Sequence, residues 1–134
     1  MVGQSDHQLI QNMLARIAHR GPDDEGIYLA ETSTGERVGL GHRRLSIIDL
    51  SPAGHEPMPD ARQELWLTFN GEIYNFRELR RELERHGHQF RSESDAEVLL
   101  YAYRQWGRDF LDRLNGMFAF AIWDARDESL LLAR

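Results

Sequence analysis

Three short segments of this sequence carry side chains that chemistry at an amide carbonyl would need. The first is Asn70-Gly71-Glu72, which stands between an apolar run and a charged amphipathic run, with a second asparagine at position 75. An asparagine amide beside a glycine backbone N–H supplies two donors to a developing oxyanion, as acyl transfer requires. The alternative is an ordinary Asn-Gly turn in which Asn75 caps the following helix.

The second segment is "GHRRLSIIDLS", where two arginines precede an apolar run. We expect one of Arg43 and Arg44 to lie at the edge of the core. A guanidinium there would bind a carboxylate through two parallel hydrogen bonds. A surface salt bridge is the alternative for either residue.

The third segment is "SESDAE", which places Asp95 at the start of a predicted helix. Its carboxylate could hold an ammonium group, or Ser94 and Asp95 could simply cap the helix. Taken together, an arginine for a carboxylate, acids for an ammonium group and paired donors for an amide oxygen describe a pocket for an amino acid with a side-chain amide.

The composition limits the classes of function. The chain has 134 residues, 41% of them hydrophobic, which suits one globular domain with a real core. A net charge of −6 argues against sequence-independent binding of nucleic acid. No run is long enough to cross a membrane and no signal peptide is visible, so we expect a cytoplasmic protein. The sequence contains no cysteine, which excludes thiol nucleophiles and thiolate metal sites among these residues.

The pattern of apolar residues predicts helices and strands that would position these segments. Ser5 or Asp6 could cap a first helix, and the loop at 19–26 and the proline-rich crossing at 51–60 would be irregular. Asn75 with Glu78 has the spacing of a capping box. The predicted elements are a helix through Leu9 to Ile17, strands at 27–31, 37–42 and 64–69, helices at 76–86, 95–106 and 110–114, and a hairpin of strands at 117–124 and 129–133. This order predicts an α+β fold with helices on antiparallel sheets.

Other polar features are weaker signals. His86 and His88 lack neighbouring acidic or cysteine ligands, so we expect no metal site. Asp23 and Asp24 could support acid–base work but are better explained by loop structure. There is no GxxxxGK[ST] or GxGxxG motif, so the chain shows no nucleotide site.

Five segments in order give the sequence a clear family resemblance. "HRGPDDEG", "LGHRRLSIIDLSPAGHEPM", "FNGEIYNFRELRREL", "SDAEVLLYAYRQWG" and "LNGMFAFAIWD" closely resemble the glutaminase domain of glutamine-dependent asparagine synthetases, a class II glutamine amidotransferase. The resemblance covers the chain from about Leu9 to Arg134. "HRRLSIIDLS" and "NGMFAFAIWD" look most like the asparagine synthetase branch.

The resemblance implies a role for each candidate residue. Arg44 matches the arginine that binds the α-carboxylate of glutamine. Asn70 and Gly71 match the pair that forms the oxyanion hole. Glu72 and Asp95 match the acids that hold the substrate amino group.

The resemblance also implies a fold and partners. The backbone around Ile47 matches a segment that lines the pocket. The implied fold is the N-terminal-nucleophile hydrolase type, a layered αββα sandwich with antiparallel sheets, here a single domain over 1–134 truncated at both ends. The ligand would be L-glutamine, and the released ammonia would pass to a synthetase domain or subunit that makes asparagine. No cofactor is implied for this domain, since ATP and magnesium would belong to the synthetase domain.

One departure from the family is large. The family nucleophile is an N-terminal cysteine at the head of a strand, whereas this chain has Val2 there and no room for that strand before the first helix. We therefore expect the chain to be inactive in glutamine hydrolysis. A missing strand would also expose a sheet edge, which favours a homo-oligomer. The alternative function is a non-catalytic module that binds glutamine or another protein.

Overall fold

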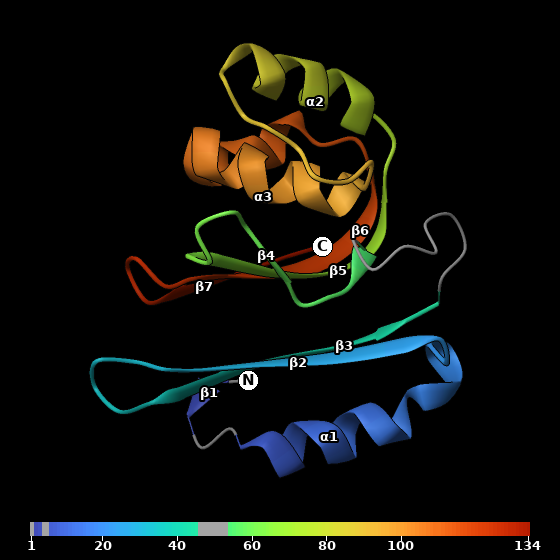
Figure 1. Ribbon diagram of the computed structural model, residues 1–134, viewed down its shortest axis with the longest axis vertical. Coiled ribbons are helices and arrows are strands. Elements are labelled where there is room, and N and C mark those ends of the chain that lie inside the picture. The colour runs from blue at the N-terminus through green and yellow to red at the C-terminus, as the bar shows by residue number, and fades with distance from the viewer. Residues whose placement is uncertain (1, 4–5, 46–53) are drawn as a thin grey trace. The chain divides into compact units, whose positions relative to one another are not determined.

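The computed structural model describes residues 2–3, 6–45 and 54–134. The chain divides into two compact units, Met1–Pro57 and Met58–Arg134. Figure 1 identifies the helices and strands of each.

The first unit is a three-stranded antiparallel sheet with one helix on it. Strands β2 (Asp24–Glu31) and β3 (Arg37–Arg44) form a hairpin, and β1 (Val2–Gly3) pairs with the other edge of β3. Helix α1 (His7–Arg16) runs along one face of this sheet (Figure 1) and is followed by the short 3-10 helix η1 (Ala18–Arg20). The sequence predicts no strand ahead of α1, and the two paired residues of β1 differ from that expectation.

Small residues let α1 approach the sheet closely. The side chains of Ile10 and Leu14 are buried against β3. A Cβ added to Gly39 would lie 2.1 Å from Ile10 Cδ1, and one added to Gly41 would lie 2.7 Å from Ile10 Cγ2. The helix begins where the predicted cap places it, because the Asp6 carboxylate accepts a hydrogen bond of 2.6 Å from the backbone N–H of Leu9.

The second unit is a four-stranded antiparallel sheet in the order β4-β5-β6-β7, with helices α2 and α3 on one face (Figure 1). Its elements are β4 (Met58–Pro59), β5 (Leu65–Ile73), α2 (Phe76–Arg85), α3 (Asp95–Trp106), the 3-10 helix η3 (Gly107–Arg113), β6 (Gly116–Asp124) and β7 (Ser129–Ala133). The predicted hairpin of β6 and β7 is confirmed, with Asp124 paired to Ser129 at its turn.

Buried and more exposed residues alternate along β5, and the buried ones form part of the core of the second unit. Leu65, Leu67 and Phe69 are buried, and they pack in one cluster with residues of α3 such as Val98 and Leu99. Each of these side chains stabilises the fold by roughly 1.5–3 kcal/mol relative to exposure. The intervening residues of β5 point to the opposite face of the sheet, which is the face that carries the candidate asparagine.

Two sequence predictions about the strands require correction. The strand predicted to begin at Ile27 begins at Asp24, because Asp24 pairs with Arg44 across the hairpin. The proline-rich crossing contains the strand β4, whose Pro59 lies at the sheet edge, where a missing N–H is tolerated. None of the described helices is long and apolar enough to cross a membrane.

The predicted caps of α2 and α3 have different outcomes in the structure. Ser94 caps α3, since its hydroxyl accepts a hydrogen bond of 3.1 Å from the Ala96 N–H. The Glu97 carboxylate, however, binds the backbone N–H groups of Arg91 and Ser92 in the preceding loop. Asn75 stands at the N-cap position, directly before α2, but its side chain makes no capping hydrogen bond, so that prediction is wrong.

Candidate functional site

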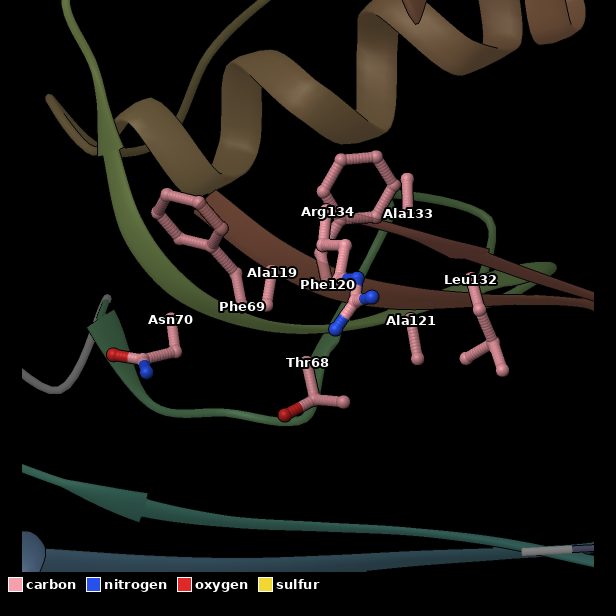
Figure 2. Close-up of a pocket in the computed structure, with 9 residues that line it drawn as sticks. All are labelled: Thr68, Phe69, Asn70, Ala119, Phe120, Ala121, Leu132, Ala133 and Arg134. Carbon is pink, nitrogen blue, oxygen red and sulfur yellow. The ribbon is translucent and has the colours of Figure 1, made fainter. Parts of the chain in front are cut away.

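Asn70, Gly71 and Glu72 lie in the last part of β5, where the strand is exposed. Asn70 is paired with Ala119 and Glu72 with Met117 across β6. Figure 2 shows the Asn70 side chain pointing away from the helix toward which the Phe69 ring points. Asn70 is exposed and lines a hollow of about 510 Å³ on this unit.

Gly71 is required by its backbone. Its φ is +147°, a conformation that side-chain-bearing residues rarely adopt. A Cβ at this position would lie 2.2 Å from the Met117 carbonyl oxygen and 2.6 Å from the Phe118 Cα. The Asn-Gly pair is therefore a kinked part of a paired strand, and the predicted alternative of a hairpin turn is wrong.

Asp95 brings an acid to the end of β5. Its Oδ2 accepts a hydrogen bond of 2.9 Å from the Ile73 backbone N–H, which joins the start of α3 to the strand. Burial raises the pKa of the Asp95 carboxyl, and the nearby charge of Glu72 adds to this effect. Two carboxylates thus gather beside the Asn-Gly pair, a setting that favours a bound cation.

Arg43 and Arg44, in the first unit, have different surroundings at the end of β3. Arg43 donates a hydrogen bond of 2.9 Å to the Gly21 carbonyl and forms an ion pair with Glu25. These contacts hold the loop before β2 against β3. The predicted alternative of a salt bridge therefore applies to Arg43.

The Arg44 guanidinium lies against Gly54. A Cβ built on Gly54 would come within 2.2 Å of one terminal nitrogen of Arg44 and 2.6 Å of its Cζ. The Arg44 carbonyl accepts a hydrogen bond of 3.0 Å from the Asp23 N–H, so the "HRGPDDEG" loop fixes the backbone at this arginine. Arg44 is half-buried, and its guanidinium lies against the backbone of Gly54.

Asp24, and polar residues that the sequence did not mark as candidates, lie near the charge of Arg44. His55 Nδ1 lies 2.7 Å from Asp24 Oδ2, and this hydrogen bond lowers the pKa of the Asp24 carboxyl. Burial lowers the pKa of His42 to about 4, with the charge of Arg44 contributing, so His42 is neutral at neutral pH. Its Nδ1 lies 3.4 Å from Glu56 Oε2. The alternating strand pattern offered no signal for this cluster, because its partners come from separate segments.

The remaining candidates lie elsewhere. The Asn75 amide donates 2.8 Å to the Arg113 carbonyl and accepts 3.0 Å from the Asn115 N–H, so it is a structural tie. Ile47 lies outside the described residues. His88 Nε2 is 2.9 Å from Gln105 Oε1. Within the described part of the chain, no three His, Asp or Glu side chains are grouped so that they could hold a metal ion.

Comparison with known proteins decides the family. The family model described as a glutamine amidotransferase domain matches residues 1–134 of this chain. The chain belongs to the glutamine amidotransferase domain family.

The relatives of this amidotransferase domain include glutamine-hydrolysing asparagine synthetases. Asparagine synthetase 1 of Bacillus subtilis is 46% identical over 127 residues, which are 95% of this chain and 19% of that protein. Asparagine synthetase 1 of Arabidopsis thaliana is 39% identical over 131 residues, which are 98% of this chain and 21% of that protein. The chain therefore spans about a fifth of the length of these relatives. Their names agree with the resemblance to asparagine synthetase glutaminase domains that the sequence shows.

A solved structure supports the fold of the amidotransferase domain. Glutamine phosphoribosylpyrophosphate amidotransferase from B. subtilis matches 98% of this chain and 36% of its own with a TM-score of 0.74, at 22% sequence identity. An identity this low shows the fold alone. The predicted α+β fold with antiparallel sheets, of the N-terminal-nucleophile hydrolase type, is confirmed.

Proposed function

We propose that this amidotransferase domain binds L-glutamine as the glutaminase part of an asparagine-synthetase-like protein. The observation that carries the proposal is the hydrogen bond of Asp95 to the Ile73 N–H at the end of β5, where the charge of Glu72 acts on Asp95 and where Asn70 is exposed in the same strand. An ammonium-binding pair of acids beside a neutral amide donor suits an amino acid whose own side chain is an amide.

Each candidate residue has a role in the proposal. Glu72 and Asp95 bind the substrate ammonium group, and Asn70 with the Gly71 N–H binds the oxygen of the side-chain amide. Arg44 binds the α-carboxylate through its guanidinium, whose planar geometry suits bidentate hydrogen bonding to a carboxylate. The family resemblance also implies a ligand contact for the backbone near Ile47, which lies outside the described residues. Its support is the family match together with the surroundings of each described residue.

Hydrolysis requires a nucleophile that these 134 residues do not supply. They contain no cysteine, and Val2 has no nucleophilic atom. We therefore propose that the polypeptide binds glutamine without releasing ammonia. The missing thiol also favours the second candidate, a non-catalytic glutamine-binding module.

The wider setting is part of the same proposal. The two units would form a single glutaminase-like domain over 1–134 that acts in the cytoplasm. In a longer protein, a synthetase domain or subunit would use ATP and the ammonia to make asparagine, as the names of the relatives suggest. Self-association of the polypeptide is also part of the proposal, because β1 pairs with β3 through two residues and such a short strand protects little of a sheet edge.

Isothermal calorimetry tests the proposal. The chain is titrated with L-glutamine, and with D-glutamine and L-norleucine as matched ligands that lack the correct chirality or the amide. We expect selective binding of L-glutamine that Arg44→Ala weakens by at least about tenfold, because a charge-assisted hydrogen-bond pair is lost. Equal binding of all three ligands would contradict the proposal, as would a folded chain that binds none.

A glutamate-release assay separates the two candidates. The proposal predicts no release above background from the wild-type polypeptide. Release at an enzymatic rate that disappears in Arg44→Ala would contradict the expected inactivity and leave the glutaminase assignment standing. Selective glutamine binding without release supports a binding module for the polypeptide alone.

A further inference from the structure

The guanidinium of Arg44 lies against Gly54, which has no side chain to occupy the same space. The three nearest heavy atoms to a Cβ built on Gly54 all belong to the Arg44 guanidinium, at 2.2, 2.6 and 3.0 Å. Since separations below 3.0 Å are not tolerated between these atoms, any side chain at position 54 would displace the guanidinium. An alanine there would meet only the far end of a flexible side chain, so the fold itself need not change.

The segment that carries Gly54 is held on the sheet by its next two residues. His55 is hydrogen-bonded to Asp24 of β2 at 2.7 Å. Glu56 approaches His42 of β3 at 3.4 Å. A Cβ on Gly26 would lie 2.1 Å from the Glu56 carbonyl oxygen, so β2 and this segment are in backbone contact. These contacts hold the backbone at Gly54 in place, so the Arg44 side chain is the group that would move if residue 54 had a side chain.

We propose that Gly54 is a positioning residue for Arg44, and that it sets where the guanidinium meets the α-carboxylate of the substrate. The inference rests on the proposed function and adds a determinant of specificity to it. An arginine side chain has many rotamers, and two-pronged binding of a carboxylate needs one orientation of its plane. A bare backbone surface beneath the guanidinium selects that orientation before the ligand arrives, which reduces the entropy lost on binding.

The variant Gly54→Ala tests the inference by calorimetry. We expect its affinity for L-glutamine to fall by about tenfold or more, since the carboxylate contact is charge-assisted. Its affinity for L-glutaminamide, which has no α-carboxylate, stays unchanged. In an Arg44→Ala background, Gly54→Ala causes no additional loss, because the two changes remove the same interaction. Equal loss for both ligands, or additive losses in the double variant, would overturn the inference.

A second readout needs no ligand. The Nε–Hε NMR signal of Arg44, assigned by its absence in Arg44→Lys, should shift in Gly54→Ala while the thermal midpoint changes by less than about 2 °C. The matched variant Gly26→Ala should lower the midpoint instead, because its Cβ meets the backbone oxygen of Glu56. If the wild-type chain binds no glutamine, the proposed function fails, and this signal still decides whether Gly54 positions Arg44. An unmoved signal overturns the inference.

Discussion

The backbone N–H of Ile73 donates a hydrogen bond of 2.9 Å to the Oδ2 of Asp95. This contact joins the last residue of β5 to the first residue of α3, which are separated by helix α2 in the sequence. It holds the Asp95 carboxylate in place at the end of β5, where the charge of Glu72 acts on it. The bond thus links the packing of the second unit to its candidate ammonium site.

Substitutions of Asp95 should separate packing from binding. Asp95→Asn retains an oxygen that can accept from Ile73, so we expect its unfolding free energy to stay near that of the wild type. Asp95→Ala leaves that N–H without its partner and should lose about 1–3 kcal/mol. Both should weaken glutamine binding by about tenfold or more, because the charge is gone. Urea unfolding and calorimetry measure the two effects, and a destabilised Asp95→Asn would contradict the role of this bond.

Stability should depend on pH through Asp95. Its pKa is raised in the folded state, mainly by burial, above the ordinary value of 3.8. The folded chain therefore binds this proton more tightly than the unfolded chain. The resulting stabilisation is complete below pH 3.8 and is lost as the pH rises through the folded pKa. Unfolding free energy, measured as the difference between the wild type and Asp95→Asn, should decline over that window.

Saturating L-glutamine supplies the control for this pH effect. A bound ammonium group favours the charged carboxylate, so the ligand should lower the pKa of Asp95 and reduce the decline. An NMR titration of the Asp95 carboxyl carbon follows the same proton directly. A pKa at or below the ordinary value without ligand would count against the buried setting of Asp95.

The end of β5 shows what sequence patterns could and could not predict. Ser94 was predicted as a helix cap and is one, because a cap is satisfied by N–H groups two or three residues away. The contact of Asp95 with Ile73 spans 22 residues and depends on how α3 packs on the sheet. Neither the local pattern nor the family resemblance predicted this contact, although both marked Asp95 as a candidate. Local spacing alone left the choice between cap and ligand open.

Gly71→Ala should damage the fold as well as the site. The methyl group would meet the Met117 carbonyl and the Phe118 backbone, and alanine disfavours a φ of +147°. We expect a loss of about 3 kcal/mol or more in unfolding free energy, measured in urea. The neighbouring Asn70→Ala serves as the matched control, since its amide is on the exposed face of the strand. It should keep wild-type stability and lose affinity for glutamine, and the reverse order of stabilities would contradict this account.

Substitutions of Asn75 can distinguish a helix cap from a side chain that connects two backbone segments. Its amide both donates to Arg113 and accepts from Asn115, at 2.8 and 3.0 Å. Aspartate and serine are good caps, but aspartate cannot donate to a carbonyl and serine is too short to bridge both groups. We expect Asn75→Asp, Asn75→Ser and Asn75→Ala all to lose about 1–2 kcal/mol, with glutamine affinity unchanged in the folded fraction. If Asn75→Ser or Asn75→Asp matched the wild type in thermal unfolding, the capping role would be restored.

The arginine pair illustrates a different limit of sequence reasoning. Arg43 and Arg44 are adjacent and identical in type, so neither periodicity nor charge could assign their roles. The close approach of Gly21 to the backbone at Arg43 and Arg44 turns Arg43 toward the loop carbonyl and Glu25. Gly54 then receives the guanidinium of Arg44. Gly21 and Gly54 thus determine where the two arginine side chains lie. Their effect cannot be predicted from local sequence, because it depends on which segments lie side by side once the strands are paired.

The first unit should lose stability in mild acid because of His42. Burial, and next the charge of Arg44, lower its pKa from 6.5 to about 4, with His55 acting in the same direction and Asp24 opposing it. The unfolded chain therefore binds this proton first, and the stabilisation present above pH 6.5 is lost as the pH falls toward about 4. At about pH 5 the loss should reach about 2 kcal/mol. His42→Gln does not titrate and retains a polar partner for Glu56, so the difference between the two proteins in urea unfolding, followed by circular dichroism, isolates this proton. Parallel pH profiles for the wild type and His42→Gln would show that His42 is protonated as easily in the folded chain as in the unfolded one.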